Sequence, residues 1–516
     1  MEENKMSKGK EILAILLLTL VIGTGTLAWI VWSSKDNTKM NVTIGDLADV
    51  SFKTGNDINI SNLSPSFYYD DGALTEFSIR KKKGLTTELN TNIYLDITSI
   101  SNELKNDNFK YVLLSSSDGN TYNEVISSSF KDASIGKLSI VTDSPLTDGK
   151  TYYKFYIWID GNNENNETMQ GKSLKGTLNV EVLTPPVNAV TLVEGLDKGE
   201  TGDSGSGVYK VTHNAIPASS SATGSEIPAV TDYRYYGANP NNYICLDMEG
   251  GSTCPDKHLY RIIGSIYEEK ENTNRLKVIK ATPLTDGTTN EFSWDDTSIG
   301  DYSNIWATIT SGNYSNSLTS GSTLMQLLNS GAWWNGTSGS YYNRSTTATN
   351  VNFTNYKLSD KAKSYITISR YYLGGYNSDL PLTNEMYGYE RGTNRYDNNR
   401  PLYWDGYVGL MYSSDYGYAA GKSCVDGTNL INYDSSCKSK DWLNNAGVNQ
   451  WLMSPNSGDP EGVLRVNYLG RAHYYVSCNY AFSARPVFYL NSSASITDGE
   501  GTSASPYILS LSSGQF

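Results

Sequence analysis

The chain has 516 residues, of which 38% are hydrophobic and 18% charged, and it contains 39 Tyr and 46 Gly residues. This length is too great for one ordinary core, so two or three domains are expected, and the composition excludes a charged disordered chain. The net charge of −13 and the lack of a basic stripe beyond residues 80–83 argue against nucleic-acid binding.

The N-terminal segment is strongly apolar. Residues 12–32 carry no charge, and as a helix this segment would be roughly 31 Å long, enough to cross a bilayer. The lysines before it favour a cytoplasmic N-terminus. The same segment has features of a signal peptide, because small residues, Thr26 and Ala28, follow its apolar stretch at cleavage spacing. Residues 1–39 are therefore predicted to be a transmembrane anchor or a signal peptide, and both place the rest of the chain outside the cytosol.

The five cysteines are interpreted in that light. Cys245 and Cys254 lie nine positions apart, and Cys424 and Cys437 lie thirteen apart. Outside the cell two local disulfides are the simplest interpretation. A zinc site would need tighter Cys pairs or more histidines than the three present. Cys478 is left over and is expected to be buried, reactive or intermolecular.

Residues 40–183 are predicted to form an all-β domain. Apolar side chains alternate in NIYLDI, YYKFYIWI and LKGTLNVEV, and the turn sequences SSDGN and LTDGK punctuate the pattern. A period of two between turns indicates antiparallel strands in a sandwich. No catalytic constellation is visible in this domain.

Three segments of this region carry a resemblance to a known family. The leader ending in GTGTLAW, the NVTIGDLADVSF that follows it and the closing MQGKSLKGTLNVEV resemble the TasA/camelysin-like exported proteins of Gram-positive bacteria. The resemblance implies a jelly-roll module with a structural or spacer role outside the cell. Some members form surface fibres, but no donor strand is identified in this sequence, so fibre formation is not carried over.

Residues 184–230 are predicted to be a linker. The segments GLDKGETGDSGSG and PASSSATGSE are rich in Gly, Ser and charged residues, a composition typical of linkers and loops. The domain boundary is placed near residue 206.

Residues 231–516 are predicted to form a larger α+β domain. HLYRIIGSIY and NRLKVIKATPL are expected to be paired strands. Helices are expected over residues 322–334 and 358–366, with Ser322 and Ser359 as their caps. The long loops rich in Tyr, Asn, Gly and Ser between short strands are expected to carry function.

A second resemblance covers most of this domain. DGYVGLMYSSDYGYAA, WLMSPNSG and FSARPVFYL resemble C-type-lectin-like domains of a bacterial subtype. That subtype includes the formylglycine-generating-enzyme fold and the variable proteins of diversity-generating retroelements, and the match is closest to uncharacterised surface proteins of gut Firmicutes. The resemblance implies a scaffold of two helices and a few strands that holds a loop-rich face.

In the retroelement proteins the variable binding residues lie just before the final Arg-Pro strand. The matching positions in this chain are Asn467, Tyr468, Arg471, His473, Tyr474, Tyr475, Ser477, Asn479 and Tyr480. The residue types favour recognition independently, because Tyr gives a large amphipathic contact area and Asn and Ser adapt their hydrogen bonds. The alternative is that the alternate tyrosines pack within a strand.

An enzymatic alternative depends on the last cysteine. Formylglycine-generating enzymes end in two cysteines five residues apart, and Cys478 matches the second while His473 occupies the place of the first. An oxidase that needs two thiols would therefore lack half its site. The protein is predicted not to be an enzyme.

Asp459 and Glu461 in NSGDPEG could hold Ca²⁺ together with backbone oxygens, although a solvated turn is the alternative; no other cofactor is expected. The sequence thus predicts an adhesin-like, surface-attached or secreted Gram-positive protein that binds an extracellular protein or glycan. It would also contact the membrane if the N-terminal helix is uncleaved. The alternatives are a structural subunit of a surface fibre or biofilm matrix and, third, a formylglycine-generating-like thiol oxidase.

Overall fold

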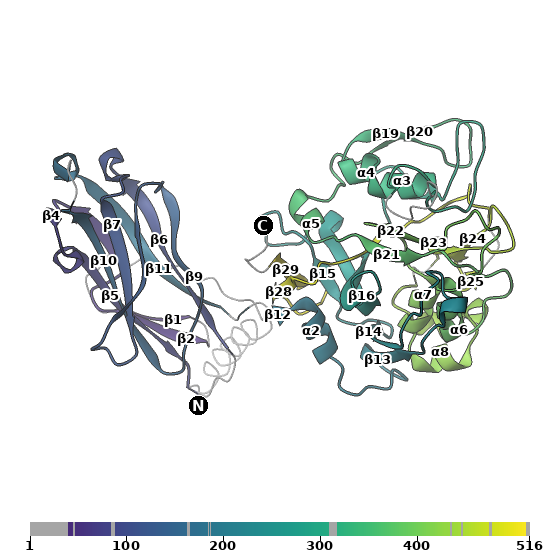
Figure 1. Ribbon diagram of the computed structural model, residues 1–516, viewed down its shortest axis with the longest axis horizontal. Coiled ribbons are helices and arrows are strands. Elements are labelled where there is room, and N and C mark those ends of the chain that lie inside the picture. The colour runs from purple at the N-terminus through teal and green to yellow at the C-terminus, as the bar shows by residue number, and fades with distance from the viewer. Residues whose placement is uncertain are drawn as a thin grey trace, which may run out of the picture. The chain divides into compact units, whose positions relative to one another are not determined.

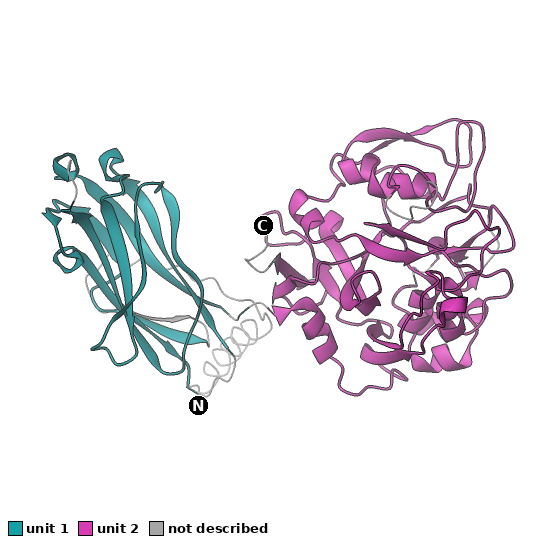
Figure 2. Ribbon diagram, in the orientation of Figure 1, with its two compact units in different colours: residues 1–185 teal, residues 186–516 magenta. Residues whose placement is uncertain are grey.

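The computed structural model describes residues 40–44, 47–83, 88–162, 166–183, 185, 187–308, 317–433, 436–444, 447–473 and 477–511. The chain divides into two compact units, residues 1–185 and 186–516 (Figure 2). Strands predominate in both (Figure 1), so the chain is a multidomain, β-rich protein as predicted. The apolar segment expected in residues 1–39 lies outside the described residues. Within the described ranges, no helix is both long and apolar enough to span a bilayer.

Unit 1 consists of two β-sheets. In spatial order the first sheet contains β1 (Met40–Ile44), β2 (Ala48–Phe52), β5 (Ala73–Lys81), β10 (Lys150–Asp160), β7 (Phe109–Ser116) and β8 (Asn123–Ser129), with β4 (Pro65–Ser66) parallel to β10. The second contains β3 (Asp57–Ser61), β11 (Ser173–Leu183), β6 (Asn90–Ile100) and β9 (Gly136–Pro145).

The core of unit 1 lies between its two sheets. Alternate residues of β6 and β11 from the second sheet share one buried cluster with those of β5 and β10 from the first, so the predicted period-two pattern is confirmed. The Phe77 and Tyr153 rings stack in this core at 4.9 Å between centroids. β10 is apolar on both faces, because Tyr156 and Trp158 belong to a separate small cluster.

The main sheet of unit 2 brings together both ends of the unit. In spatial order it contains β12 (Val187–Asn188), β28 (Ala494–Asp498), β29 (Tyr507–Leu511), β15 (Tyr243–Cys245), β16 (Leu259–Glu268), β14 (Val230–Tyr236) and β13 (Gly207–His213); β17 (Thr273–Lys280) pairs with β16 and with β27 (Val487–Tyr489). The pairing of β16 with β17 is antiparallel, as predicted.

The expected linker over residues 184–230 differs from the structure. Most of this segment belongs to unit 2: the helix α2 (Ala189–Gly195) adds Val193 to the core, and β13 forms an antiparallel pair with β14 over its whole length. The Gly- and Ser-rich stretches are the loops beside these elements. Their composition describes exposed backbone and does not mark a boundary between units.

The remaining elements of unit 2 are short. Four small sheets contain β18 (Phe292–Ser293) with β26 (Ala481–Phe482), β19 (Ser338–Tyr341) with β20 (Thr349–Asn352), β21 (Ser369–Tyr372) with β22 (Tyr403–Gly406), and β23 (Gln450–Pro455), β24 (Val463–Val466) and β25 (Ala472–His473) in that order. The other helices are α3 (Thr323–Asn329), α4 (Ala332–Asn335), α5 (Asp360–Ser364), α6 (Thr383–Glu390), α7 (Ser413–Ala419) and α8 (Lys422–Gly427).

Both predicted caps are present. The Oγ of Ser322 accepts a hydrogen bond from the Met325 N–H, and the Oγ of Ser359 accepts one from the Ala362 N–H. The first expected helix is divided into α3 and α4, because the cap at Ser330 is not helical.

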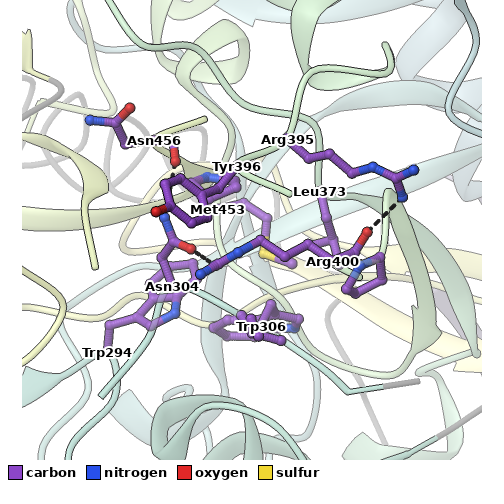
Figure 3. Close-up of a pocket in the computed structure, with 12 residues that line it drawn as sticks. Trp294, Asn304, Trp306, Leu373, Arg395, Tyr396, Arg400, Met453 and Asn456 are labelled. Carbon is purple, nitrogen blue, oxygen red and sulfur yellow. Dashed lines mark hydrogen bonds between the residues drawn. The ribbon is translucent and has the colours of Figure 1, made fainter. Parts of the chain in front are cut away.

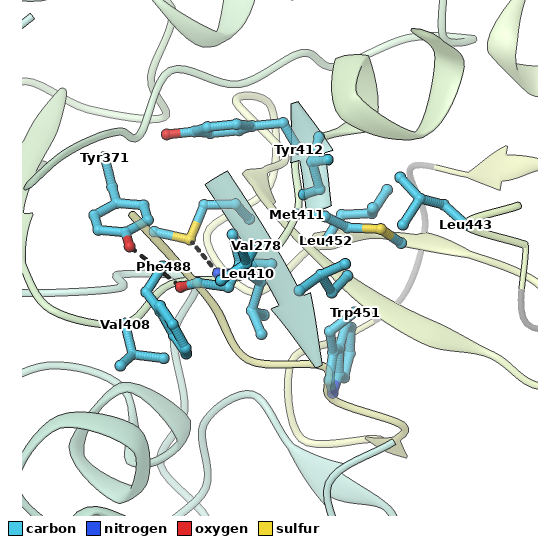
Figure 4. Packing of buried hydrophobic residues seen from close by; sticks show 14 of the residues in the cluster. Val278, Tyr371, Val408, Leu410, Met411, Tyr412, Leu443, Trp451, Leu452 and Phe488 are labelled. Atoms are coloured by element: carbon cyan, nitrogen blue, oxygen red, sulfur yellow. Dashed lines mark hydrogen bonds between the residues drawn. The ribbon is translucent and has the colours of Figure 1, made fainter. Parts of the chain in front are cut away.

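One large core joins the elements of unit 2. Figure 4 shows a part of it in which Val278 of β17 and Phe488 of β27, partners in the sheet, belong to the same packed cluster as Trp451 and Leu452 of β23. Long loops are thereby attached to a single packed body rather than to separate small cores.

Both predicted disulfides are formed, Cys245–Cys254 and Cys424–Cys437. Two disulfides are typical of a protein that folds in an oxidising compartment. Each closes a short loop on the surface of unit 2 and limits the freedom of the unfolded chain.

Candidate functional site

The predicted site begins at the hairpin that joins β24 to β25. The Oδ1 of Asn467 accepts hydrogen bonds from the N–H groups of Leu469 and Arg471. Gly470 closes the turn with a φ of 86°, a conformation that glycine adopts without strain. Asn467 is buried and holds the turn together, so the prediction that its side chain contacts a ligand is not supported.

The tip of this hairpin is exposed. Tyr468 is 56% exposed and Leu469 is 38% exposed, which makes them two of the large hydrophobic residues most open to solvent in unit 2. The backbone beneath them is fixed, since the Tyr416 hydroxyl donates to the Gly470 carbonyl at 2.7 Å and the Tyr468 N–H donates to Asn449 Oδ1 at 3.2 Å. Exposed side chains thus stand on a restrained backbone.

A second part of the surface is built around Tyr480. The guanidinium of Arg344 lies 3.9 Å from the centroid of the Tyr480 ring, and its Nη2 donates to the Tyr480 hydroxyl at 3.1 Å. The ring also stacks on Phe482, with 6.0 Å between the two ring centroids. Tyr480 is partly buried by these contacts, and its position is defined by them.

Arg465 connects the two parts. It lies opposite His473 in the β24–β25 pair, and its guanidinium is 4.8 Å from the centroid of the Phe482 ring. It also interacts electrostatically with both Tyr468 and Tyr480. We call the set Arg344, Arg465, Tyr468, Leu469, Arg471, His473 and Tyr480 the hairpin face.

The charge of the hairpin face is positive. It contains three arginines and no Asp or Glu, although the whole chain has a net charge of −13. Burial and then the neighbouring Arg465 lower the pKa of His473, whereas Asp379 acts in the opposite direction. His473 is therefore neutral at pH 7, and the positive charge comes from the arginines.

The other predicted positions have different places. Ser477 forms a bridge with Gly462, and the carbonyl of Asn479 accepts a hydrogen bond from the Ser293 hydroxyl at 2.8 Å; both residues are partly buried. Tyr474 and Tyr475 lie outside the described residues.

Three members of the hairpin face, Leu469, Arg465 and Arg344, were missed by the sequence reasoning; Leu469 directly follows the predicted Tyr468. Arg465 could have been noticed as a charged residue in the apolar strand VLRV. Arg344 carries no such signal, because it lies 136 positions from Tyr480 along the chain.

Cys478 is fully buried and is the free cysteine among the described residues. Burial raises its pKa well above the usual value, and the nearby carboxylate of Asp295 adds to the effect. A buried protonated thiol is a poor nucleophile, so Cys478 is placed for packing and not for thiol chemistry.

One carboxylate of the turn expected to hold Ca²⁺ is engaged within the turn itself. The Asp459 carboxylate accepts a hydrogen bond from the Glu461 N–H at 2.9 Å. Across the described part of the chain, no group of three His, Cys, Asp or Glu residues is arranged to hold a metal ion.

A buried ionic network lies next to the hairpin. Asp415 of α7 pairs with Lys277 at 2.5 Å and with Arg234 at 2.9 Å, and Arg234 also binds Asp232 at 2.7 Å. All four side chains are almost completely buried. Burial disfavours the charge on Asp415, but Lys277 and Arg234 outweigh it and keep its pKa below the usual value. Its position next to Tyr416 on α7 links the network to the hairpin.

No family model matches the chain, and the search of curated proteins finds no match to it either.

Proposed function

We propose that unit 2 is a recognition domain of a surface-attached or secreted protein and that it binds an extracellular ligand through the hairpin face. The observation that carries this proposal is the exposed Tyr468–Leu469 tip, held on a hydrogen-bonded turn beside ordered Arg and Tyr side chains. Rigid aromatic and arginine side chains are the residues that most often dominate binding energy at protein interfaces.

Restraint of the hairpin backbone favours binding. A surface that is already ordered loses less conformational entropy when a ligand binds. The turn around Asn467, the Tyr416 hydrogen bond to Gly470 and the contacts of Asn449 restrain the backbone before any ligand arrives.

The positive charge suggests the class of ligand. The three arginine side chains of the hairpin face favour a protein or glycan that presents carboxylates or other acceptors. Binding is expected to weaken as salt is added, because exposed charges are screened.

The wider architecture is part of the same proposal. A C-type-lectin-like fold for unit 2 and a TasA-like jelly roll for unit 1 would fit a protein in which unit 1 is a spacer that displays the recognition domain. The buried state of Cys478 gives the thiol-oxidase alternative no support.

The test is a screen of the full chain against protein and glycan arrays, followed by titration of the ligand found. Tyr468→Ala is expected to reduce affinity at least about tenfold, because a central Tyr contact commonly contributes more than about 1.4 kcal/mol. Its matched control is Tyr68→Ala in unit 1, which removes a tyrosine that is 69% exposed.

Both substitutions are expected to leave the melting temperature almost unchanged, since exposed side chains contribute little to stability. Equal affinity of wild type, Tyr468→Ala and Arg344→Ala for the ligand would refute binding by the hairpin face. Loss of affinity in Tyr68→Ala would instead place the site on unit 1.

A further inference from the structure

Unit 2 contains a narrow cavity, and none of the residues that line it belongs to the hairpin face. Its walls include Trp294, Trp306, Met453, Arg395 and Arg400. In Figure 3 the Arg400 side chain crosses the cavity between the two indole rings on one side and Tyr396 on the other. The cavity offers about 20 Å³ to the centres of water-sized groups, so only the end of a small molecule can enter.

Two indole N–H groups in this lining lack an acceptor. Trp294 and Trp306 are at most 1% exposed, and neither Nε1 has a hydrogen-bond partner among the described residues. Two other buried indoles of unit 2 are satisfied, since Trp442 donates to the Tyr235 carbonyl and Trp451 to the Phe292 carbonyl. A buried donor without an acceptor costs free energy, which an acceptor inside the cavity would recover.

The charged groups of the lining are both cations. Arg395 donates to the Arg400 carbonyl at 2.8 Å. The guanidinium of Arg400 donates to the Asn304 Oδ1 and to the Pro460 carbonyl, and its carboxylate partner, Asp397, lies 3.4 Å away and outside the lining. Two of these three acceptors of the Arg400 guanidinium are neutral oxygens.

The orientation of Asn304 is fixed. Its Nδ2 donates to three backbone carbonyls, those of Asn456, Asp459 and Gly462, at 2.7 to 3.0 Å. Its oxygen must then face Arg400. The cavity thus presents N–H donors and positive charge, with no Asp or Glu among its lining residues.

We infer that this cavity binds one carboxylate group of a small organic acid. The two indole N–H groups donate to the carboxylate oxygens, and Arg395 and Arg400 supply the compensating charge. A carboxylate fits better than a phosphate dianion, because the cavity is narrow and Asp397 already offsets part of the arginine charge. Tyr396, which is 46% exposed, stands at the rim and can cover the organic part of the acid. This site is separate from the hairpin face and does not depend on it.

The probe is sodium acetate, added to full-length protein labelled with an isotope at the indole nitrogens. The indole resonances of Trp294 and Trp306, assigned with the Phe variants, are expected to shift in a saturable way as acetate is added. Trp404 provides an internal control, because its buried Nε1 also lacks a partner among the described residues but does not line the cavity. Its resonance is expected to stay in place.

Arg395→Gln removes one charge from a partly exposed position and is expected to weaken acetate binding at least about tenfold. A matched control is Arg370→Gln, whose arginine pairs with Asp405 elsewhere in the unit. Absence of a saturable shift in the wild-type protein would overturn the proposal, as would an equal response to sodium chloride. Neither result would change ligand binding by the hairpin face, so the two sites are tested independently.

Discussion

Replacement of Glu390 by Gln is expected to change how the stability of unit 2 depends on pH. Glu390 is completely buried at the end of α6. It accepts hydrogen bonds from the N–H and hydroxyl of Ser414, and Arg391 lies 3.6 Å away. Burial raises the pKa of Glu390 from its ordinary value of 4.5 to about 7, although Arg391 opposes this shift.

The sign follows from proton binding. Between pH 4.5 and pH 7 the folded unit keeps the Glu390 proton while the unfolded chain releases it. The contribution of Glu390 is therefore fully present below pH 4.5 and is lost as the pH rises through about 7. A change from 4.5 to about 7 corresponds to about 3 kcal/mol of unfolding free energy.

The assay is urea unfolding at several pH values, monitored by tryptophan fluorescence. The signal reports mainly on unit 2, because most of the ten tryptophans belong to it. Gln does not titrate but retains an oxygen for the Ser414 N–H and an amide for its hydroxyl. The free energy of wild type minus that of Glu390→Gln is expected to fall by about 3 kcal/mol from pH 4.5 to pH 7.

Asp295 provides the matched control for this measurement. Burial raises the pKa of Asp295 from 3.8 to about 6, despite hydrogen bonds from the N–H groups of Ser303 and Thr323. Asp295→Asn should therefore remove only the pH dependence that Asp295 contributes between pH 3.8 and about 6, and leave the contribution of Glu390 between pH 4.5 and about 7. Parallel pH profiles for wild type and Glu390→Gln would refute a raised pKa at Glu390.

Three further outcomes are expected. Mild reduction that opens Cys245–Cys254 should cost unit 2 about 3 kcal/mol in urea unfolding and leave unit 1, which has no cysteine, unchanged; an unchanged midpoint for unit 2 would contradict this. Asn467→Ala should cost about 1–2 kcal/mol, because two N–H groups lose their acceptor, and Asn467→Asp should recover most of it; equal stability of Asn467→Ala and wild type would argue against a structural role. Cys478 should resist iodoacetamide in the native protein and react in urea, as measured by intact mass; rapid native labelling would show that the thiol is accessible.

The sequence predicted the strands and caps that depend on local patterns. The alternation in β6, β10 and β11 and the caps at Ser322 and Ser359 are read over a few neighbouring residues, and the structure contains all of them. The prediction of a linker over residues 184–230 was wrong because it too depended on local composition alone. The composition of this segment is that of loops, but β13 is a strand because it pairs with β14. In this pair Gly207 lies opposite Tyr236, which is more than twenty positions further along the chain.

Whether the predicted positions bind a ligand stays a prediction, and the structure shows only how their side chains are placed. Alternation and composition could locate the polar and aromatic cluster before the final strands, but not decide which side chains close the turn. Asn467 uses its side chain to hold its own hairpin, whereas Tyr468, its neighbour, faces solvent. Arg344 reaches Tyr480 from another part of the chain, and only the fold brings them together.

The buried ion pairs and the support of the hairpin face both depend on the short helix α7. In α7, Asp415 forms ion pairs with Lys277 and Arg234 in the core, and the hydroxyl of the next residue, Tyr416, donates to the Gly470 carbonyl under the hairpin tip. Loss of one partner in such a buried network typically costs about 3–5 kcal/mol. A change such as Lys277→Met would leave Asp415 with less compensation and loosen α7. Hairpin order and ligand affinity should then fall together, although no residue of the hairpin face has been altered.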